Sequence, residues 1–234
     1  MHWKILDTGT RSAEENMQID AHLLEELENT AILHFYDWEK TSATYGYFLD
    51  PKEFIDLEAA RRRGLDLGRR STGGGIVFHI WDMAFSVLVP KSAPVFSENT
   101  LENYSFVNQA VLRAVKKFLD IPCQLTPDDA PLFDRSCSRF CMAQPTKYDL
   151  IYEGKKIAGA AQRKRKQGYL HQGTIALCMP DQEYLEDILL PGSRVYEAMQ
   201  AYTYPLLGKT ATTDDVQEAK RVLRGILTQS FRGS

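Results

Sequence analysis

Strand-like segments joined by links of only a few residues are the feature that most constrains how this chain can fold. Segments 75–80 and 84–89 are rich in β-branched and aromatic residues and are separated by a tight turn. Segments 148–153 and 156–162 are also predicted strands, separated by a two-residue turn. Links this short favour antiparallel neighbours, because a parallel pair needs a long crossover. The sequence therefore predicts mixed, largely antiparallel sheets instead of a doubly wound parallel sheet.

Amphipathic helices are interspersed with these strands. Ser12 and Glu15 have the spacing of a capping box, which predicts a helix that begins at residue 13. Apolar residues recur at steps of three and four in further segments. The predicted helices are 13–28, 100–119, 195–201 and 214–228, and the additional strands are 31–36, 44–49 and 174–179. Together they indicate an α+β fold in which helices flank the sheets.

The length of 234 residues suits one large domain. The linker candidate 204–213 contains Pro205 and Gly208, and the segment behind it holds a single helix. We expect one domain over residues 1–207 and a C-terminal helical extension of the same domain over 208–234. No apolar run reaches the roughly 20 residues of a membrane helix, and no secretory signal is visible. With four cysteines expected as free thiols, these features predict a cytoplasmic location and no membrane partner.

The net charge of −3 hides an uneven distribution. Residues 61–166 carry 18 basic and 10 acidic side chains, a net charge of +8, while both flanking segments are acidic. A basic stretch in a net-acidic protein suggests a local anionic partner and argues against a nucleic-acid binder. The run 163–166 is predicted as the tip of a hairpin and as a docking surface. The structural alternative is a solvated basic face.

A glycine-rich motif before a predicted strand is the first candidate site. It comprises Arg69, Arg70, Ser71, Thr72, Gly73, Gly74 and Gly75. Three glycines let a backbone approach a ligand closely, and their N–H groups can face an anion or a carbonyl group. The spacing excludes a P-loop and a dinucleotide-binding fingerprint. The structural alternative is a flexible turn before the strand that carries His79.

The second candidate is the predicted strand that carries Lys156. Side chains alternate on a strand, so Lys156, Ala158, Ala160 and Gln162 are predicted to share one face. Small residues between a lysine and a glutamine describe a shallow slot. A buried lysine beside that slot would polarise a carbonyl group or hold a carboxylate. The structural alternative is a surface lysine on an edge strand.

Cys141 is the third candidate. A free cysteine is more often a small buried apolar residue than a nucleophile, and nearby cations are what make a thiol reactive. Lys156 would supply such a cation if the predicted hairpin brings it near. His171 by itself is more typical of a hydrogen-bonded structural histidine. Cys137 and Cys141 lack a second pair of ligands, so no metal site is predicted.

These segments, in this order, resemble the lipoate branch of the lipoate–biotin protein ligase superfamily. Residues 70–79 are similar to its Arg-Arg-x-Thr-Gly-Gly-x-x-Val-x-His motif, and residues 156–162 to its Lys-Ile-x-Gly-Ser-Ala-Gln motif. Residues 171–174 resemble the His-Gly-Thr/Ser strand that follows, and the resemblance extends over residues 3–205. It implies the α+β catalytic-domain fold of that superfamily.

The resemblance also implies roles for particular residues. Cys141 and Lys156 would be catalytic, and no metal ligand is implied. The acyl substrate would be contacted by residues from all three motifs. These are Arg70, Ser71, Thr72, Gly73, Gly74, Gly75, His79, Gly159, Gln162, His171, Gly173 and Thr174.

The lipoate branch contains two chemistries. Octanoyltransferases pass octanoate from acyl carrier protein through a cysteine thioester and need no cofactor, whereas lipoate-protein ligases use ATP and magnesium to form lipoyl-AMP. Residues 141–149 are similar to the transferases' Cys-Phe-x-x-Pro-x-x-Tyr-Glu segment, and residues 82–90 and 191–200 also resemble transferases. The tail after Leu207 is shorter than the ligases' usual accessory domain.

These features favour an acyltransferase of protein lipoylation. It would move an octanoyl or lipoyl group from acyl carrier protein through a Cys141 thioester to a lysine of a lipoyl-domain protein. Such an acceptor would be glycine cleavage H protein or the lipoyl-bearing component of a 2-oxoacid dehydrogenase. The basic stretch would then face these acidic partners.

Three departures from the family pattern keep two alternatives open. Ile80 stands where the family usually has Asp, Ala160 replaces the usual Ser, and His171-Gln172 is a shifted version of the usual pair. An ATP-dependent lipoate-protein ligase is the first alternative, because it shares the glycine-rich and lysine motifs. A non-catalytic module that binds lipoyl domains or carrier protein is the second, because of the departures.

Overall fold

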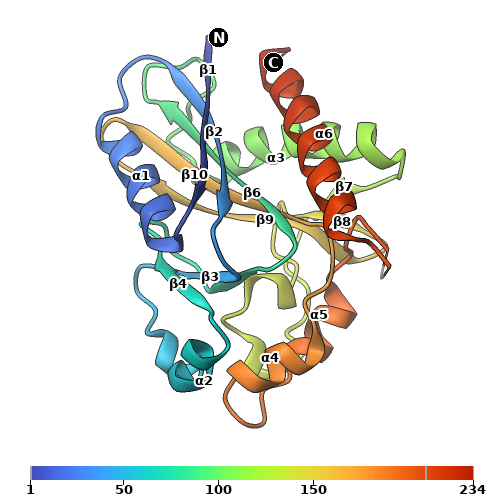
Figure 1. The fold of residues 1–234 in the computed structure, drawn as a ribbon. Coiled ribbons are helices and arrows are strands. Elements are labelled where there is room, and N and C mark those ends of the chain that lie inside the picture. Colours follow the sequence, from blue (N-terminus) through green and yellow to red (C-terminus); the bar gives the residue numbers. More distant parts are fainter. Residues whose placement is uncertain (1, 209, 234) are drawn as a thin grey trace.

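Two β-sheets form the frame of the molecule (Figure 1). The computed structural model describes residues 2–208 and 210–233. The larger sheet has seven strands in the order β1-β2-β6-β10-β9-β8-β7. They are β1 (Trp3–Arg11), β2 (Ala31–Trp38), β6 (Asp82–Pro90), β7 (Gln124–Leu125), β8 (Leu150–Tyr152), β9 (Lys155–Lys164) and β10 (Gly168–Ala176). The smaller sheet has the order β4-β3-β5, with β3 (Ser42–Tyr45), β4 (Asp66–Arg69) and β5 (Ile76–His79).

Most neighbouring strands are antiparallel. Within the described residues, β1 pairs with β2 in parallel and β3 with β4 in parallel, and every other neighbouring pair is antiparallel. The predicted α+β class with mixed, largely antiparallel sheets is therefore confirmed.

Helices cover both faces of the larger sheet. They are α1 (Ala13–Glu25), α2 (Leu57–Arg62), α3 (Thr100–Leu119), α4 (Gln182–Ile188), α5 (Val195–Tyr202) and α6 (Thr213–Arg232). The expected capping box at Ser12 and Glu15 is present at the start of α1. Helices α3 and α6 pack together on one face over the main core, where the rings of Trp3 and Phe231 are 4.7 Å apart. Helix α1 packs on the opposite face, and α2, α4 and α5 surround the smaller sheet (Figure 1).

The predicted pairing of segments 75–80 and 84–89 is wrong. The first segment forms β5 of the smaller sheet, and the second forms β6 of the larger sheet. The short link is a crossing between the two sheets, which is possible because both strands are buried and each finds its own partners. This crossing brings His79 at the end of β5 into contact with Asp82 at the start of β6.

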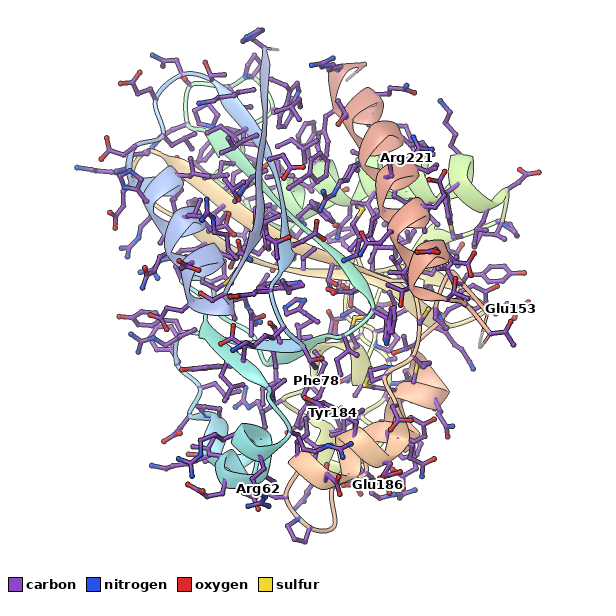
Figure 2. The ribbon with its side chains drawn as sticks, in the orientation of Figure 1. Arg62, Phe78, Glu153, Tyr184, Glu186 and Arg221 are labelled. Atoms are coloured by element: carbon purple, nitrogen blue, oxygen red, sulfur yellow. The ribbon has the colours of Figure 1, made fainter. Side chains whose placement is uncertain are left out.

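The other predicted hairpin is present. Strands β8 and β9 are joined at Glu153 and Gly154, which have φ angles of 49° and 75° and so suit a tight hairpin turn. Figure 2 shows Glu153 at the outer edge of the molecule, as expected for a turn. Strand β10 was predicted to begin at residue 174 but begins at Gly168. Its first half is poor in β-branched residues, and pairing with β6 and β9 on both sides outweighs that low propensity.

Candidate active site

A cavity lies between the two sheets and encloses about 420 Å³ of empty space, including its opening to solvent. Residues from α1, both sheets and the loop before β8 line it. They are Met17, Tyr36, Thr44, Arg70, Val77, His79, Cys141, Met142, Lys156, Gly159, Ala160, Ala161, Gln172, Gly173 and Thr174. Seven of the fourteen residues singled out from the sequence belong to this set, so the three motifs converge on one place.

A β-bulge decides which side chains of β9 face this cavity. Lys156 pairs with Ile151 and Ala158 pairs with the adjacent Leu150, so β9 holds one extra residue here. Ile157 and Ala158 consequently both contribute to the main core. The predicted common face of Lys156, Ala158, Ala160 and Gln162 is therefore corrected: after the bulge, Gly159 and Ala161 pair with cavity-lining Thr174 and Gln172.

Cys141 begins a short 3-10 turn, Cys141–Ala143, and its side chain is partly exposed. The segment before it runs against the glycine-rich loop, where the N–H of Ile76 donates to the carbonyl of Arg139 at 2.5 Å. A Cβ atom on Gly75 would lie 2.0 Å from that same carbonyl oxygen. The sequence therefore needs glycine at position 75 to bring Cys141 against the loop.

Lys156 is a buried cation with two acceptors. Its Nζ donates to Asp149 Oδ2 and to the backbone carbonyl of Cys141, both at 2.7 Å, and both charged side chains are at most 4% exposed. Thr146 donates to the same carboxylate through its N–H at 2.7 Å and its hydroxyl at 2.8 Å. Burial raises the pKa of Asp149, and the Lys156 ammonium opposes that rise. A Cβ on Gly159 would lie 2.2 Å from Lys156 Cε, so glycine leaves the space that the lysine occupies.

Arg70 braces the glycine-rich loop from inside. Its Nη2 donates to the carbonyls of Gly73 and Gly75 at 3.2 and 2.7 Å, and its Nη1 donates to the carbonyl and hydroxyl of Thr44 at 3.0 and 2.8 Å. The side chain is buried. Gly74 lies beside it with a φ angle of 89°, and a Cβ there would lie 3.4 Å from Arg70 Nη2 and 3.8 Å from Cys141 Sγ. The guanidinium group and the thiol therefore face the same point of the loop.

His79 belongs to a hydrogen-bonded chain and does not contact Cys141 through any recorded hydrogen bond of the described residues. Its Nε2 is 2.8 Å from the Thr44 hydroxyl, and its Nδ1 is 2.6 Å from Asp82 Oδ2, which also accepts from Thr174. Burial alone would raise the pKa of Asp82, but the His79 charge and hydrogen bonds outweigh it and hold that pKa below its usual value. Trp38 stacks on the imidazole ring at 4.1 Å.

Thr72 and Ser71 do not line the cavity, but they anchor the glycine-rich loop. The hydroxyl of Thr72 donates to Gln172 at 2.7 Å, and Gln172 in turn donates to buried Asp20 at 2.7 Å. The carbonyl of Ser71 accepts from Arg163. Gly73 and Gly74 complete this loop.

Gln162 and His171 lie on the opposite face of the same two strands. They pair across β9 and β10, and Gln162 Nε2 is 2.7 Å from His171 Nδ1. The histidine ring contacts Tyr104 and Phe85. Burial lowers the pKa of His171 to about 3, so it is neutral at ordinary pH. The structure does not bring these two predicted substrate-binding residues to the cavity.

Sequence reasoning missed several residues that matter to the site. The carboxylates are Asp20, Asp82 and Asp149, and the further cavity-lining residues are Met17, Tyr36, Thr44, Val77, Met142, Ala161 and Gln172. Asp82 and Asp149 stand within the quoted motifs, so their acidity was a usable signal. Nothing in the local sequence distinguishes Thr44 or Val77 from other strand residues.

The fold and the converging motifs define a family. The chain belongs to the lipoyl protein ligase A/B catalytic-domain family, whose family model matches residues 12–218. This confirms the resemblance to the lipoate branch that the motifs indicate.

Several similar proteins carry the name octanoyltransferase LipM. The chain is 30% identical to that of Geobacillus kaustophilus over 231 residues, which cover 93% of this chain and 83% of the relative. It is 29% identical to that of Bacillus subtilis with the same coverage, and 34% identical to that of Lysinibacillus sphaericus over 78% of this chain and 68% of the relative. The expectation of an octanoyl- or lipoyl-transferring enzyme is supported by these relatives.

Solved structures share the fold. Lipoate-protein ligase A bound with ATP aligns with a TM-score of 0.71 at 22% identity, covering 99% of this chain and 86% of that one. The lipoate protein ligase of Thermoplasma acidophilum with bound lipoic acid aligns with a TM-score of 0.69 at 23% identity, covering 99% and 87%. Among the described residues, no helix is long and apolar enough to cross a membrane.

Proposed function

We propose that this enzyme moves an octanoyl group from acyl carrier protein to a lysine of a lipoyl-domain protein, through a thioester on Cys141. The observation that carries this proposal is the placement of a partly exposed thiol in a cavity that also holds two buried cations, Lys156 and Arg70. A thiol near cations is the environment in which a cysteine acts as a nucleophile.

The first step exchanges one thioester for another. The Cys141 thiolate attacks the carbonyl carbon of the acyl thioester, so that a new carbon–sulfur bond forms and the bond to the carrier sulfur breaks. The carrier leaves as a thiolate and takes a proton from solvent. Lys156 Nζ has three N–H groups, two of which bond to Asp149 and the Cys141 carbonyl. The third is available to the oxyanion that develops on the acyl group. No ATP is needed, because one thioester replaces another of similar energy.

The second step forms the amide. The uncharged ε-amine of the acceptor lysine attacks the acyl-enzyme carbonyl, a carbon–nitrogen bond forms, and Cys141 leaves as a thiolate. The amine loses one proton to solvent. Met17, Tyr36 and Val77 give the cavity apolar walls that suit a saturated acyl chain, and we assign the chain to this space.

The partners follow from the same chemistry. Carrier proteins and lipoyl domains present the reacting group on a long flexible arm, which suits a nucleophile set inside a cavity. We propose acyl carrier protein as donor and a lipoyl-domain protein as acceptor. The similar Lysinibacillus, Bacillus and Geobacillus proteins are named octanoyltransferases, in agreement with the octanoyl group.

The test is intact-mass measurement after incubation with octanoyl carrier protein. We expect one octanoyl adduct on the wild type, none on Cys141→Ala, and an unchanged adduct on Cys178→Ala, since Cys178 lies in a different groove. Adding a lipoyl domain should move the octanoyl group onto that domain. An adduct that survives Cys141→Ala contradicts the proposal. Pyrophosphate release with lipoate and ATP that persists in Cys141→Ala would instead establish the ligase chemistry.

A further inference from the structure

Arg70 is a buried cation without a carboxylate partner. Its side chain is 4% exposed, yet none of the recorded ion pairs in residues 2–208 and 210–233 includes it. Its four hydrogen bonds all go to neutral acceptors, and its Nε has no partner. Burying an ion without a counter-charge is costly, so a retained buried guanidinium group points to an anion that is present during function.

Lys156 shows the contrast within the same cavity. It is equally buried, but Asp149 neutralises it at 2.7 Å. Its Nζ is further fixed by the carbonyl of Cys141. The charge of Lys156 is therefore already balanced, and the charge of Arg70 is not.

The Cys141 sulfur and the Arg70 guanidinium group lie on the same side of Gly74. Sγ and Nη2 both lie within 4 Å of the position that a Cβ on Gly74 would occupy, at 3.8 and 3.4 Å. Burial lowers the pKa of Arg70, and the interaction with Cys141 is the first of the contributions that oppose this fall. No Asp or Glu is among those groups.

We infer that Arg70 is a further catalytic residue, whose guanidinium group holds Cys141 as a thiolate. This inference rests on the proposed function, in which Cys141 is the nucleophile. Arg70 does not accept the proton, because guanidinium stays charged in proteins. The thiol proton goes to solvent, and the thiolate and guanidinium neutralise each other. Lys156 is then left to stabilise the acyl oxyanion.

This division of roles assists both steps. Before attack, the thiolate is the reactive form of cysteine. In the second step Cys141 departs as a thiolate again, so the same guanidinium group stabilises the leaving group. Arg70 thereby stabilises the Cys141 thiolate both as the nucleophile and as the leaving group, while Lys156 stabilises the acyl oxyanion.

The test measures the thiolate directly and needs no acyl donor. The rate of alkylation of Cys141 by iodoacetamide is followed against pH, with the modified peptide identified by mass spectrometry. An opposite charge within a few ångströms shifts such a profile by about one to three pH units. We expect Arg70→Gln to move the midpoint upward and to slow alkylation at pH 7 by about tenfold or more. Arg70→Lys should recover part of the rate, because it restores the charge.

Two controls separate charge from loop support. Arg163→Gln removes another arginine that braces the same loop, through the carbonyl of Ser71, and should leave the Cys141 profile unchanged. Cys178 is partly exposed and lacks a neighbouring cation among the causes of its pKa shift, so its own profile should be the same in every variant.

Each outcome gives a definite answer. An unchanged Cys141 profile in Arg70→Gln overturns the inference. An equal shift of the Cys141 profile in Arg163→Gln would mean that Arg70 acts only by supporting the loop, and this also overturns the inference. Failure of the proposed function is a separate result: no octanoyl adduct forms on the wild type, whatever the alkylation profile.

Discussion

The two faces of the β9–β10 strand pair differ in how their buried polar side chains are accommodated. On the cavity face, the ammonium group of Lys156 is paired with Asp149 and donates to a backbone carbonyl. On the other face, His171 lies against Phe85 and Tyr104 and stays neutral, with a pKa of about 3. The same two strands thus hold a charged pair on one face and pack against the apolar core on the other.

The β-bulge at Ile157 produces this difference. Without the extra residue, Lys156 would lie on the face of Gln162 and His171, among apolar residues of the main core. With it, the lysine lies over Gly159, and its Nζ donates to the backbone carbonyl of Cys141. One inserted residue therefore decides whether Lys156 reaches the cavity.

The largest effect is expected from removing the paired cation. Lys156→Gln leaves the Asp149 carboxylate buried and unpaired, which should lower the free energy of unfolding by about 3–5 kcal/mol. It should also slow single-turnover acylation of Cys141 by roughly 10²–10³, the usual cost of losing one oxyanion donor. Chemical denaturation measures the first quantity, and quenched-flow mass spectrometry measures the second.

A double variant separates these two losses. Lys156→Gln with Asp149→Asn removes both charges, so most of the stability should return while acylation stays slow. Full recovery of the acylation rate in the double variant would show that Lys156 acts only on folding.

The opposite face gives the next largest effect, and it depends on pH. In the unfolded chain His171 takes up a proton near pH 6.5, whereas the folded protein resists it down to a pKa of about 3. The contribution of His171 to the free energy of unfolding is therefore fully present above about pH 6.5, and it is lost as the pH falls below that value. Between pH 6.5 and 4.5 the loss should be about 2 kcal/mol, because one pH unit corresponds to about 1.4 kcal/mol for one proton.

The non-titrating variant His171→Gln should lack this part of the acid sensitivity, as urea unfolding at the two pH values would measure. His22→Gln changes an exposed histidine of α1 and should retain the wild-type dependence. Equal acid sensitivity in wild type and His171→Gln would contradict the neutral, buried state of His171.

The contrast between the faces also marks what sequence can predict. The motifs predict that Arg70, Cys141 and Lys156 belong to one site, and all three line one cavity. This could be predicted because the residue types themselves, two cations and a thiol, indicate the chemistry. The face of Lys156 could not be predicted, since a bulge has no signature in alternating side chains. The crossing from β5 to β6 was likewise hidden, because a short link between two buried strands is also typical of a hairpin.

A smaller effect is expected where glycine makes room for the cation. Gly159→Ala places a Cβ 2.2 Å from Lys156 Cε and 2.5 Å from Nζ, so the lysine must move. We expect acylation to slow by about tenfold, less than full removal of the donor. The alkylation profile of Cys141 should stay unchanged, because Arg70 and not Lys156 faces the sulfur. A shifted profile would contradict the assignment of Arg70 to the Cys141 sulfur and of Lys156 to the acyl oxygen alone.

The smallest effect is expected at the outer end of this strand pair, where β9 turns into β10. Of the basic run 163–166, Arg163 stacks on Tyr47 and Lys164 pairs with Glu98, which leaves Arg165 and Lys166 exposed at the turn. If the turn contacts an acidic protein partner, Arg165→Glu with Lys166→Glu should raise the KM for that partner by about fivefold at low salt. The effect should fade at high ionic strength, because exposed charges are screened.

A matched control lies at the far end of the molecule. Arg61→Glu with Arg62→Glu makes the same change in net charge on α2, where Figure 2 shows Arg62. If docking is local to the turn, only the first double variant changes KM, and kcat stays the same in both because neither pair reaches the cavity. An equal rise in both variants would mean that the partner responds to overall charge. No rise in KM in either variant would mean that the basic turn is a solvated surface without a docking role. The basic side chains that affect activity would then be those of the cavity, Arg70 and Lys156.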